Sequence, residues 1–520
     1  MTKQNKELRI KQALDVLAVL LIILAVHYVV GAFNGKWPWS ANAYNSYLLQ
    51  ALSWLEGRLD LGQNYEYLEL AVFQDKYYVS FPPFPSYVLL PFACFLKEQT
   101  PEGWIAFFAM LLGAFYALRI AWHYLGTGGK AVFWTCFLYV GTNVLYITLD
   151  AGVWFIAQSF ALTLSLMAIF YAIKGKGGWS LFFWGCSVGC RPLQVLYFPL
   201  LFYTLYKGLK KKNPQQNLLS MIKEKFYWAV PVCLIAFSYM VLNYARFGNP
   251  IEFGHNYLPE FTREEYGQFN IHYVANNIKS LFRLPIPSDT GNGTLVFYKF
   301  DGNNIFLVMP LFVSYLIYFV RKWITKQKMD PVFLFGVPVL VILHIVGLCA
   351  HRTMGGFHFG HRYIIDVLPY IYWNILLFAR TKFDEVAEDL EEAPICDIAT
   401  ANNNCTTAYA ETMITNNDTT TTPEAVSEDP IAQPDTTSAA CSDADADNEP
   451  EPVADATIPA TVSTEGTENP VLTEHNKTNA KEATEAITSA DFTYCLHYGL
   501  CALGFALNLV GTIVTNMNWA

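Results

Sequence analysis

The chain of 520 residues is 53% hydrophobic and 16% aromatic and carries a net charge of −10. Its apolar runs approach the ~20 residues that cross a bilayer's hydrocarbon core, which excludes an ordinary soluble domain. Residues 384–485 hold 24 acidic and 2 basic residues, which leaves a balance of +12 elsewhere. That excess suits a lipid bilayer and anionic lipid phosphates, and gives no reason to expect nucleic acid as a partner.

The apolar runs predict an all-α, polytopic membrane protein. The first run, Val16 to Phe33, is too long for the core of a signal peptide and lacks a small-residue cleavage pattern, so we expect it to be retained. Eleven transmembrane helices are expected, at 14–33, 102–125, 130–148, 153–173, 178–190, 192–207, 226–245, 304–320, 331–350, 361–379 and 493–514.

Two stretches leave the number of spans open. Residues 80–97 are apolar but contain four prolines, and 178–207 is interrupted at Arg191-Pro192. Short cytoplasmic loops should be the basic ones, and more lysines fall inside if 80–97 lies along the interface and the chain turns back at Arg191. We therefore expect a cytoplasmic amino terminus and a long first external loop, 34–101, that holds interfacial helices.

Residues 381–490 differ in composition from the apolar runs and the loops between them. They are rich in Thr, Ala, Asp, Glu, Asn and Pro and almost lack aromatic residues, so they cannot bury enough apolar surface to fold alone. We expect a disordered, acidic cytoplasmic insert between a membrane domain at 1–380 and a final span within 491–520.

Candidate carboxylates gather on the external side. Glu69, Asp60 and Asp75 lie in the first external loop, and Asp150 lies in the tight turn LDAG. A carboxylate there can act as a general base or can hold a divalent cation against a phosphate. The alternative is that these are ordinary solvated loop acids. No metal site is predicted, because the eleven cysteines lack a CxxC pair and the histidines of 351–361 lack the spacing of known zinc motifs.

Basic residues occupy other external turns. Arg191 lies between two apolar halves, where a cation needs an anion or an interfacial position. The loop HRTMGGFHFGHRYIIDVLP contains Arg352, His361 and Arg362 among three glycines, and arginines there can grip a phosphate bidentately. The loop RFGNPIEFGHNYLPEF, with His255, suits sugar stacking or a simple connector.

The order of these segments resembles a known family. A first external loop ending in KYYVSFPPFPSYVLLPF is followed by RP between apolar halves, then YARFGNPIEFGHNYLP, then FGHRYIIDVLP. This order resembles the GT-C superfamily of integral-membrane glycosyltransferases, and within it bacterial proteins similar to polyprenyl-phosphate-mannose protein mannosyltransferases. The resemblance covers about residues 10–380 and the last span, and so makes 1–380 a GT-C-like domain.

The resemblance implies inverting transfer of a hexose or pentose from a polyprenyl-phosphate donor at the external face of the cell membrane. The acceptor is a cell-envelope glycan, glycolipid or protein, no cofactor is certain, and a divalent cation is left open. It implies catalytic roles for Glu69, Asp150 and Asp60. Donor-phosphate contacts are expected from Arg191, Arg362, Arg352, His361 and Lys76, and substrate contacts from Tyr77, Tyr78 and His255.

One departure bears on catalysis. Many relatives carry an acidic residue soon after the first span, where this chain has Asn42. An amide cannot take up a proton at neutral pH, so Glu69 becomes the expected base, with Asp150 as a second acidic partner. Two other functions stay open at this point: a transporter of lipid-linked glycan or polysaccharide, and an inactive membrane scaffold whose acidic insert binds basic partners.

Overall fold

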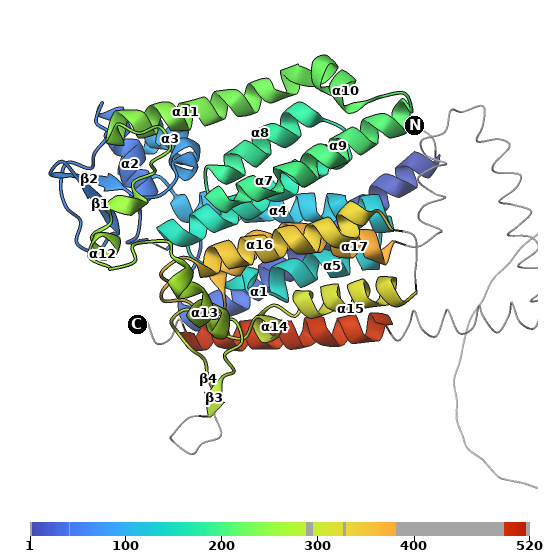
Figure 1. Ribbon diagram of the computed structural model, residues 1–520. Coiled ribbons are helices and arrows are strands. Elements are labelled where there is room, and N and C mark those ends of the chain that lie inside the picture. The colour runs from blue at the N-terminus through green and yellow to red at the C-terminus, as the bar shows by residue number, and fades with distance from the viewer. Residues whose placement is uncertain (1–2, 41, 288–294, 326–328, 381–492, 516–520) are drawn as a thin grey trace, which may run out of the picture. The chain divides into compact units, whose positions relative to one another are not determined.

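The computed structural model describes residues 3–40, 42–287, 295–325, 329–380 and 493–515. The predicted insert, 381–490, lies outside these residues. The described chain is mostly helical (Figure 1), and six of its helices are long and apolar enough to cross a bilayer: Lys3–Asn34, Glu102–Leu125, Val153–Ile173, Leu218–Phe247, Val332–Cys349 and Thr493–Thr515. The chain is therefore a multi-pass, helical membrane protein.

Each of the eleven expected spans contains helix, although several are broken. The elements are α1 (Lys3–Asn34), α4 (Glu102–Leu125), α5 (Gly129–Val140) with α6 (Val144–Ile147), α7 (Val153–Ile173), α8 (Gly177–Val188), α9 (Phe198–Lys212), α10 (Leu218–Lys225) with α11 (Ala229–Phe247), α14 (Ile305–Val308) with α15 (Leu311–Ile324), α16 (Val337–Cys349), α17 (Leu368–Ala379) and Thr493–Thr515. At 1.5 Å per residue, α5, α8 and α17 are each shorter than the ~30 Å hydrocarbon core. The count of eleven spans thus stays a prediction.

The first external loop is more varied than expected. It contains α2 (Ser46–Leu55), the strands β1 (Leu70–Phe73) and β2 (Lys76–Val79), and α3 (Phe84–Leu96). The strands pair in an antiparallel hairpin whose turn residues, Gln74 and Asp75, have positive φ angles of 51° and 59°, as a two-residue type I′ turn requires. The loop thus holds the expected helices, α2 and α3, together with a hairpin that the sequence did not predict.

Helix α3 matches the expected interfacial segment in length. Its 13 residues would extend ~20 Å, too little to cross the hydrocarbon core. It packs on α2, where the Ser86 hydroxyl lies 2.9 Å from the Tyr47 carbonyl oxygen and 2.8 Å from Gln50 Oε1. These contacts fix the position of α3, and with it the link from β2 to α3, relative to α2.

The predicted site loops and the basic segments lie at opposite ends of the helices (Figure 1). Helices α2, α3 and α12 (Pro259–Thr262) and the β1–β2 hairpin gather at one end, whereas α10 and the start of α1 lie at the other. The lysine-rich end of α9, Lys210–Lys212, runs toward the α10 end. The start of α1, the end of α9 and α10 thus share one end of the helices, as the positions of lysine and arginine in the sequence predict. Which end faces the cytoplasm stays a prediction.

Helix α7 links this architecture to the site. Its apolar residues are buried almost throughout, as expected for a helix that is apolar all round and packed inside a bundle. It begins at Val153, just after the Asp150 turn, so its first turn presents Trp154 at the end of the molecule where the site loops gather.

Candidate functional site

Segments that lie far apart in the sequence converge on one cavity, of about 430 Å³. They include the link between β2 and α3, the start of α7, the turn after α8, the loop after α11, the end of α16 with the loop that follows it, and the segment that begins η6 (Arg362–Val367). We call this the arginine cavity. Its lining includes polar, charged and aromatic side chains: Ser80, Trp154, Arg191, Glu252, His255, His351, Arg362, Tyr363 and Asp366.

Arg191 faces this cavity with its position fixed by a buried carboxylate. Its Nε donates to Asp366 Oδ2 at 2.7 Å, and the Asp366 side chain is 2% exposed. Its guanidinium carbon also lies 4.7 Å from the centroid of the Tyr363 ring. Because Arg191 contacts Asp366 through Nε, its two terminal nitrogens, Nη1 and Nη2, take no part in this ion pair.

Arg362 is more deeply buried and less completely paired. Its Nε donates to the Gly355 carbonyl oxygen at 2.8 Å, and its guanidinium carbon lies 4.6 Å from the Tyr363 ring and 5.9 Å from the Trp154 ring. Its buried Nη1 has no hydrogen-bond partner among the described residues. A buried guanidinium donor without an acceptor is costly, so this nitrogen is suited to receiving an anion from the cavity.

A glycine fixes the loop that carries Arg362. Gly360 has a φ of 76°, and a Cβ at this position would collide with the Asn143 side-chain amide. The His361 backbone N–H donates to Asn143 Oδ1 at 3.1 Å. Only glycine combines this backbone conformation with so close an approach, and the contact holds the loop against the α5–α6 link.

The histidines of the arginine cavity add no charge. Burial lowers the pKa of His255 to about 4 and that of His351 to about 3. His255 Nδ1 lies 2.9 Å from the Ser80 carbonyl oxygen, so this nitrogen donates the hydrogen bond. Glu252 lines the cavity, but its oxygens accept from the Gly254 N–H and from Asn256 Nδ2 of the same loop. The guanidiniums thus supply the positive charge of the cavity.

Glu69 lies beside this cavity through Trp154. The Trp154 Nε1–H donates to Glu69 Oε2 at 2.9 Å. The Glu69 side chain is exposed, yet protein atoms crowd it. This loss of hydration raises the pKa of Glu69, against the smaller lowering effects of the Trp154 hydrogen bond and the Arg362 charge. The result is a carboxylate of raised proton affinity that also feels the charge of Arg362.

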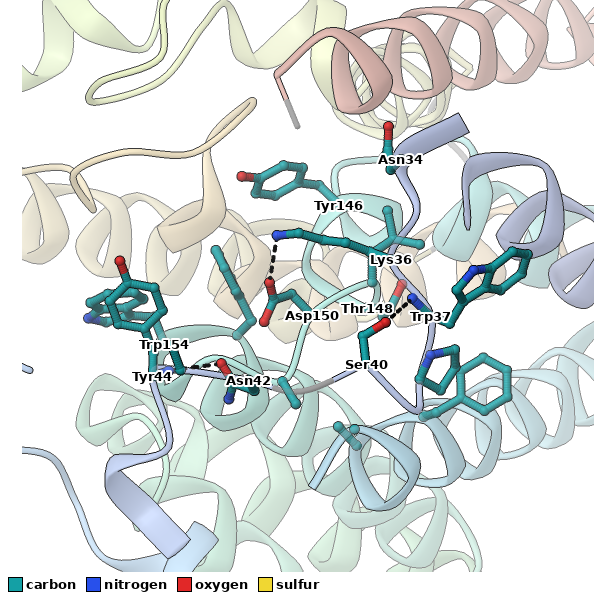
Figure 2. A pocket seen from close by; sticks show the side chains of 18 of the residues that line it. Asn34, Lys36, Trp37, Ser40, Asn42, Tyr44, Tyr146, Thr148, Asp150 and Trp154 are labelled. Carbon is teal, nitrogen blue, oxygen red and sulfur yellow. Dashed lines mark hydrogen bonds and ion pairs between the residues drawn. The ribbon is translucent and has the colours of Figure 1, made fainter. Parts of the chain in front are cut away.

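Asp150 lines a second cavity, of about 440 Å³, which we call the Asp150 cavity (Figure 2). Lys36 Nζ donates to Asp150 Oδ2 at 3.2 Å, and the Gly152 N–H donates to Asp150 Oδ1 at 2.7 Å. Asn42, the position where the resemblance expects an acid, lines the same cavity. Trp154 lines both this cavity and the arginine cavity.

The structure places the other predicted site residues outside both cavities. Asp60 pairs with Lys76 at 3.5 Å, and Arg352 pairs with Glu264 at 2.7 Å. The fully buried His361 ring lies with Nε2 3.1 Å from the Ser280 carbonyl oxygen. The tyrosines of β2, Tyr77 and Tyr78, are part of the hairpin, where the Tyr78 ring lies 5.2 Å from the Phe247 ring.

The sequence reading missed several residues of the site. Trp154 and Asp366 fall inside the predicted spans 153–173 and 361–379, and nothing local in the sequence marks either of them. Each can be found only when the fold brings it to a partner far along the chain, 85 residues away for Trp154 and Glu69, and 175 for Asp366 and Arg191. Lys36 was missed for the same reason, because Asp150 lies 114 residues away.

The described residues contain no group of three or more His, Cys, Asp or Glu side chains placed to hold a metal ion. The divalent cation left open by the sequence therefore stays untested.

Comparison with known proteins gives a limited result. No protein-family model and no curated protein matches the chain. Two solved structures are similar to it: ArnT from Cupriavidus metallidurans in the apo state, and ArnT from the same organism bound to undecaprenyl phosphate. Each is 14% identical with a TM-score of 0.40, and covers 72% of this chain. The chain spans 61% and 62% of their lengths. A likeness at this score does not establish a shared activity, so the candidate site stands on its geometry.

Proposed function

We propose that this protein is a membrane glycosyltransferase that moves a sugar from a polyprenyl-phosphate donor to an acceptor on the non-cytoplasmic face. The observation that carries the proposal is one cavity with two guanidiniums beside a carboxylate. Arg191 and Arg362 both lie within 5 Å of the Tyr363 ring, and Glu69 accepts from the Trp154 indole that lines the same cavity.

The arginines suit the donor phosphate. Guanidinium and phosphate form short, charge-assisted hydrogen bonds, often in a bidentate arrangement. The unpaired Nη1 of Arg362 offers one such donor. When the bond between the anomeric carbon and the phosphate oxygen breaks, negative charge grows on the departing polyprenyl phosphate, and preorganised cations stabilise it where it develops.

Glu69 suits the role of base. Its carboxylate would take the proton of an acceptor hydroxyl, whose oxygen then bonds to the anomeric carbon as the phosphate leaves. The raised pKa of Glu69 increases its affinity for that proton. The hydrogen bond from Trp154 holds the carboxylate in place without neutralising it.

The phosphate contact is tested by binding. In purified protein, Arg191→Ala and Arg362→Ala should each weaken the binding of labelled polyprenyl phosphate by about 10- to 100-fold, since each removes a charged hydrogen-bond donor worth ~1.5–3 kcal/mol. The matched control is Arg352→Ala, because Arg352 is paired with Glu260 and Glu264 outside the cavity and its loss should change binding less than about twofold. Equal effects of all three variants would contradict the assignment of this cavity.

The role of Glu69 predicts a pH dependence. A base works only when deprotonated, so kcat/KM should fall as the pH drops through the pKa of Glu69. Because crowding raises that pKa, the acid limb should lie above the usual range of a glutamate. We expect Glu69→Gln to lose this limb in a pH profile measured with labelled donor. A variant that keeps the wild-type limb would assign the titration to another group.

A further inference from the structure

The Asp150 cavity is unused by the proposed donor contacts. It matches the arginine cavity in size, at about 440 Å³ against 430 Å³, and both lie in the ~300–1,000 Å³ range of small-molecule sites. The two cavities have Trp154 in common, and the carboxylate of Glu69 is bonded to this residue. Glu69 itself is in the lining of neither cavity, so the Trp154 indole is the link between a molecule in the Asp150 cavity and the proposed base.

The charges of this cavity cancel. Its lining contains one lysine, Lys36, and one aspartate, Asp150. The Lys36 Nζ lies 3.2 Å from Asp150 Oδ2, so the two side chains form an ion pair. Figure 2 shows the lysine reaching to the carboxylate across the middle of the cavity. The arginine cavity is lined by two guanidiniums and by two carboxylates, Glu252 and Asp366, but the Nη1 of Arg362 there has no hydrogen-bond partner among the described residues. The two cavities therefore differ in whether a buried cationic donor is left for an anion. The Asp150 cavity favours a neutral, polar molecule over a phosphate.

Two asparagines leave hydrogen-bonding atoms unused. Asn34 Nδ2, Asn34 Oδ1 and Asn42 Nδ2 are buried and have no hydrogen-bond partner among the described residues. Asn42 Oδ1, in contrast, accepts from the Tyr44 N–H at 3.0 Å. Buried amide groups are normally satisfied by protein, water or ligand. A ligand that satisfies these three atoms must both donate and accept hydrogen bonds, as hydroxyl groups do.

Aromatic rings form part of the remaining wall, beside small and aliphatic residues. Trp37 lies stacked on Trp39 with ring centroids 5.1 Å apart, and the Tyr44 and Trp154 rings are also 5.1 Å apart. Tyr146 and other aromatic side chains complete the lining. A pyranose presents C–H faces to such rings and hydroxyls around its edge, whereas an extended peptide presents its polar atoms along a backbone. The combination of aromatic walls with amide donors and acceptors fits a sugar.

We propose that the Asp150 cavity binds the acceptor of the transfer reaction and that this acceptor is a neutral saccharide. The inference rests on the proposed function and deepens it by naming the acceptor class. A hydroxyl of the saccharide passes its proton to the Glu69 carboxylate and its oxygen bonds to the anomeric carbon of the donor. The bond from that carbon to the phosphate oxygen breaks, and its electron pair leaves with the polyprenyl phosphate. The product is a glycosidic bond between two sugars.

The test uses purified full-length protein, polyprenyl-phosphate mannose and glucose labelled in the sugar, and membranes from cells that lack the gene as the source of acceptor. Label should appear in a saccharide through a glycosidic bond, as identified by glycosidase release and mass spectrometry. Asn34→Ala and Asn42→Ala should each raise the apparent KM for acceptor about tenfold. Their KM for donor should stay within about twofold of wild type, which also shows that the variants are folded.

The control is Asn276→Ala, because this asparagine is exposed and lies outside both cavities. It should leave both KM values unchanged. Label on a serine or threonine of a polypeptide would overturn the saccharide assignment while the glycosyltransferase stands. An unchanged acceptor KM in both cavity variants would overturn the assignment of the cavity. No transfer by the wild-type protein from either donor would instead count against the proposed function itself.

Discussion

Glu69→Gln should lower the kcat of sugar transfer by about 10²- to 10⁴-fold, the usual contribution of a positioned general base. Glutamine keeps the size of the side chain and can still accept from the Trp154 indole, but it cannot take up a proton at neutral pH. Polyprenyl-phosphate binding should therefore change little. The measurement is transfer from labelled polyprenyl-phosphate hexose by purified protein, together with a binding assay for polyprenyl phosphate.

Two further variants separate Glu69 from the other acids. Asp60→Asn is the matched control from the same loop, because Asp60 pairs with Lys76 and Arg58 away from both cavities. It should retain nearly all activity. Asp150→Asn should affect acceptor KM more than kcat if Asp150 orients the acceptor. If Glu69→Gln transfers at the wild-type rate and Asp150→Asn does not, the base is Asp150.

Asp366→Ala should destabilise the protein and abolish productive donor binding. The carboxylate is 2% exposed and pairs with Arg191 at 2.7 Å, and removal of one partner from a buried ion pair costs about 3–5 kcal/mol. The loss arises because Arg191 stays in place without its counter-ion. Thermal unfolding of the purified protein in detergent should show a clear drop in the midpoint temperature.

A double variant tests this explanation. Arg191→Met with Asp366→Leu replaces both charges by apolar side chains of similar size, which often costs little stability. The double variant should regain most of the thermal stability lost by Asp366→Ala, yet should not bind polyprenyl phosphate. A double variant as unstable as the single one would mean that the Asp366 side chain acts through another contact, such as the hydrogen bond that its Oδ1 accepts from Gln158 Nε2 at 3.4 Å.

Local composition was enough to predict the apolar helices but not the strands. Apolar runs bounded by Gly, Pro and charged residues located all eleven helical segments, because burial in lipid and protein follows hydrophobicity directly. The β1–β2 hairpin was missed because KYYV and LAVF are short, and their pairing depends on a two-residue turn without glycine, at Gln74 and Asp75.

The candidate site was predictable only in part. Arg191, Arg362 and His255 stand out in sequence because polar residues at the ends of apolar runs are costly without a partner, and all three line the arginine cavity. Lys76 and Arg352 are also cations in predicted external loops and stand out in the sequence in the same way. Acids on neighbouring segments pair with them outside the cavity, and sequence does not show which cations are already paired.

The shared position of Trp154 makes the two cavities energetically dependent on each other. Its ring lines both, its N–H bonds Glu69, and the Arg362 guanidinium lies 5.9 Å from its ring. A ligand that shifts this indole from one side changes the wall that the other ligand meets, and such coupling is reciprocal by thermodynamic necessity. Loss of the indole bond would also raise the proton affinity of Glu69. A single tryptophan thereby connects occupancy of each cavity to the protonation of the carboxylate that accepts its hydrogen bond.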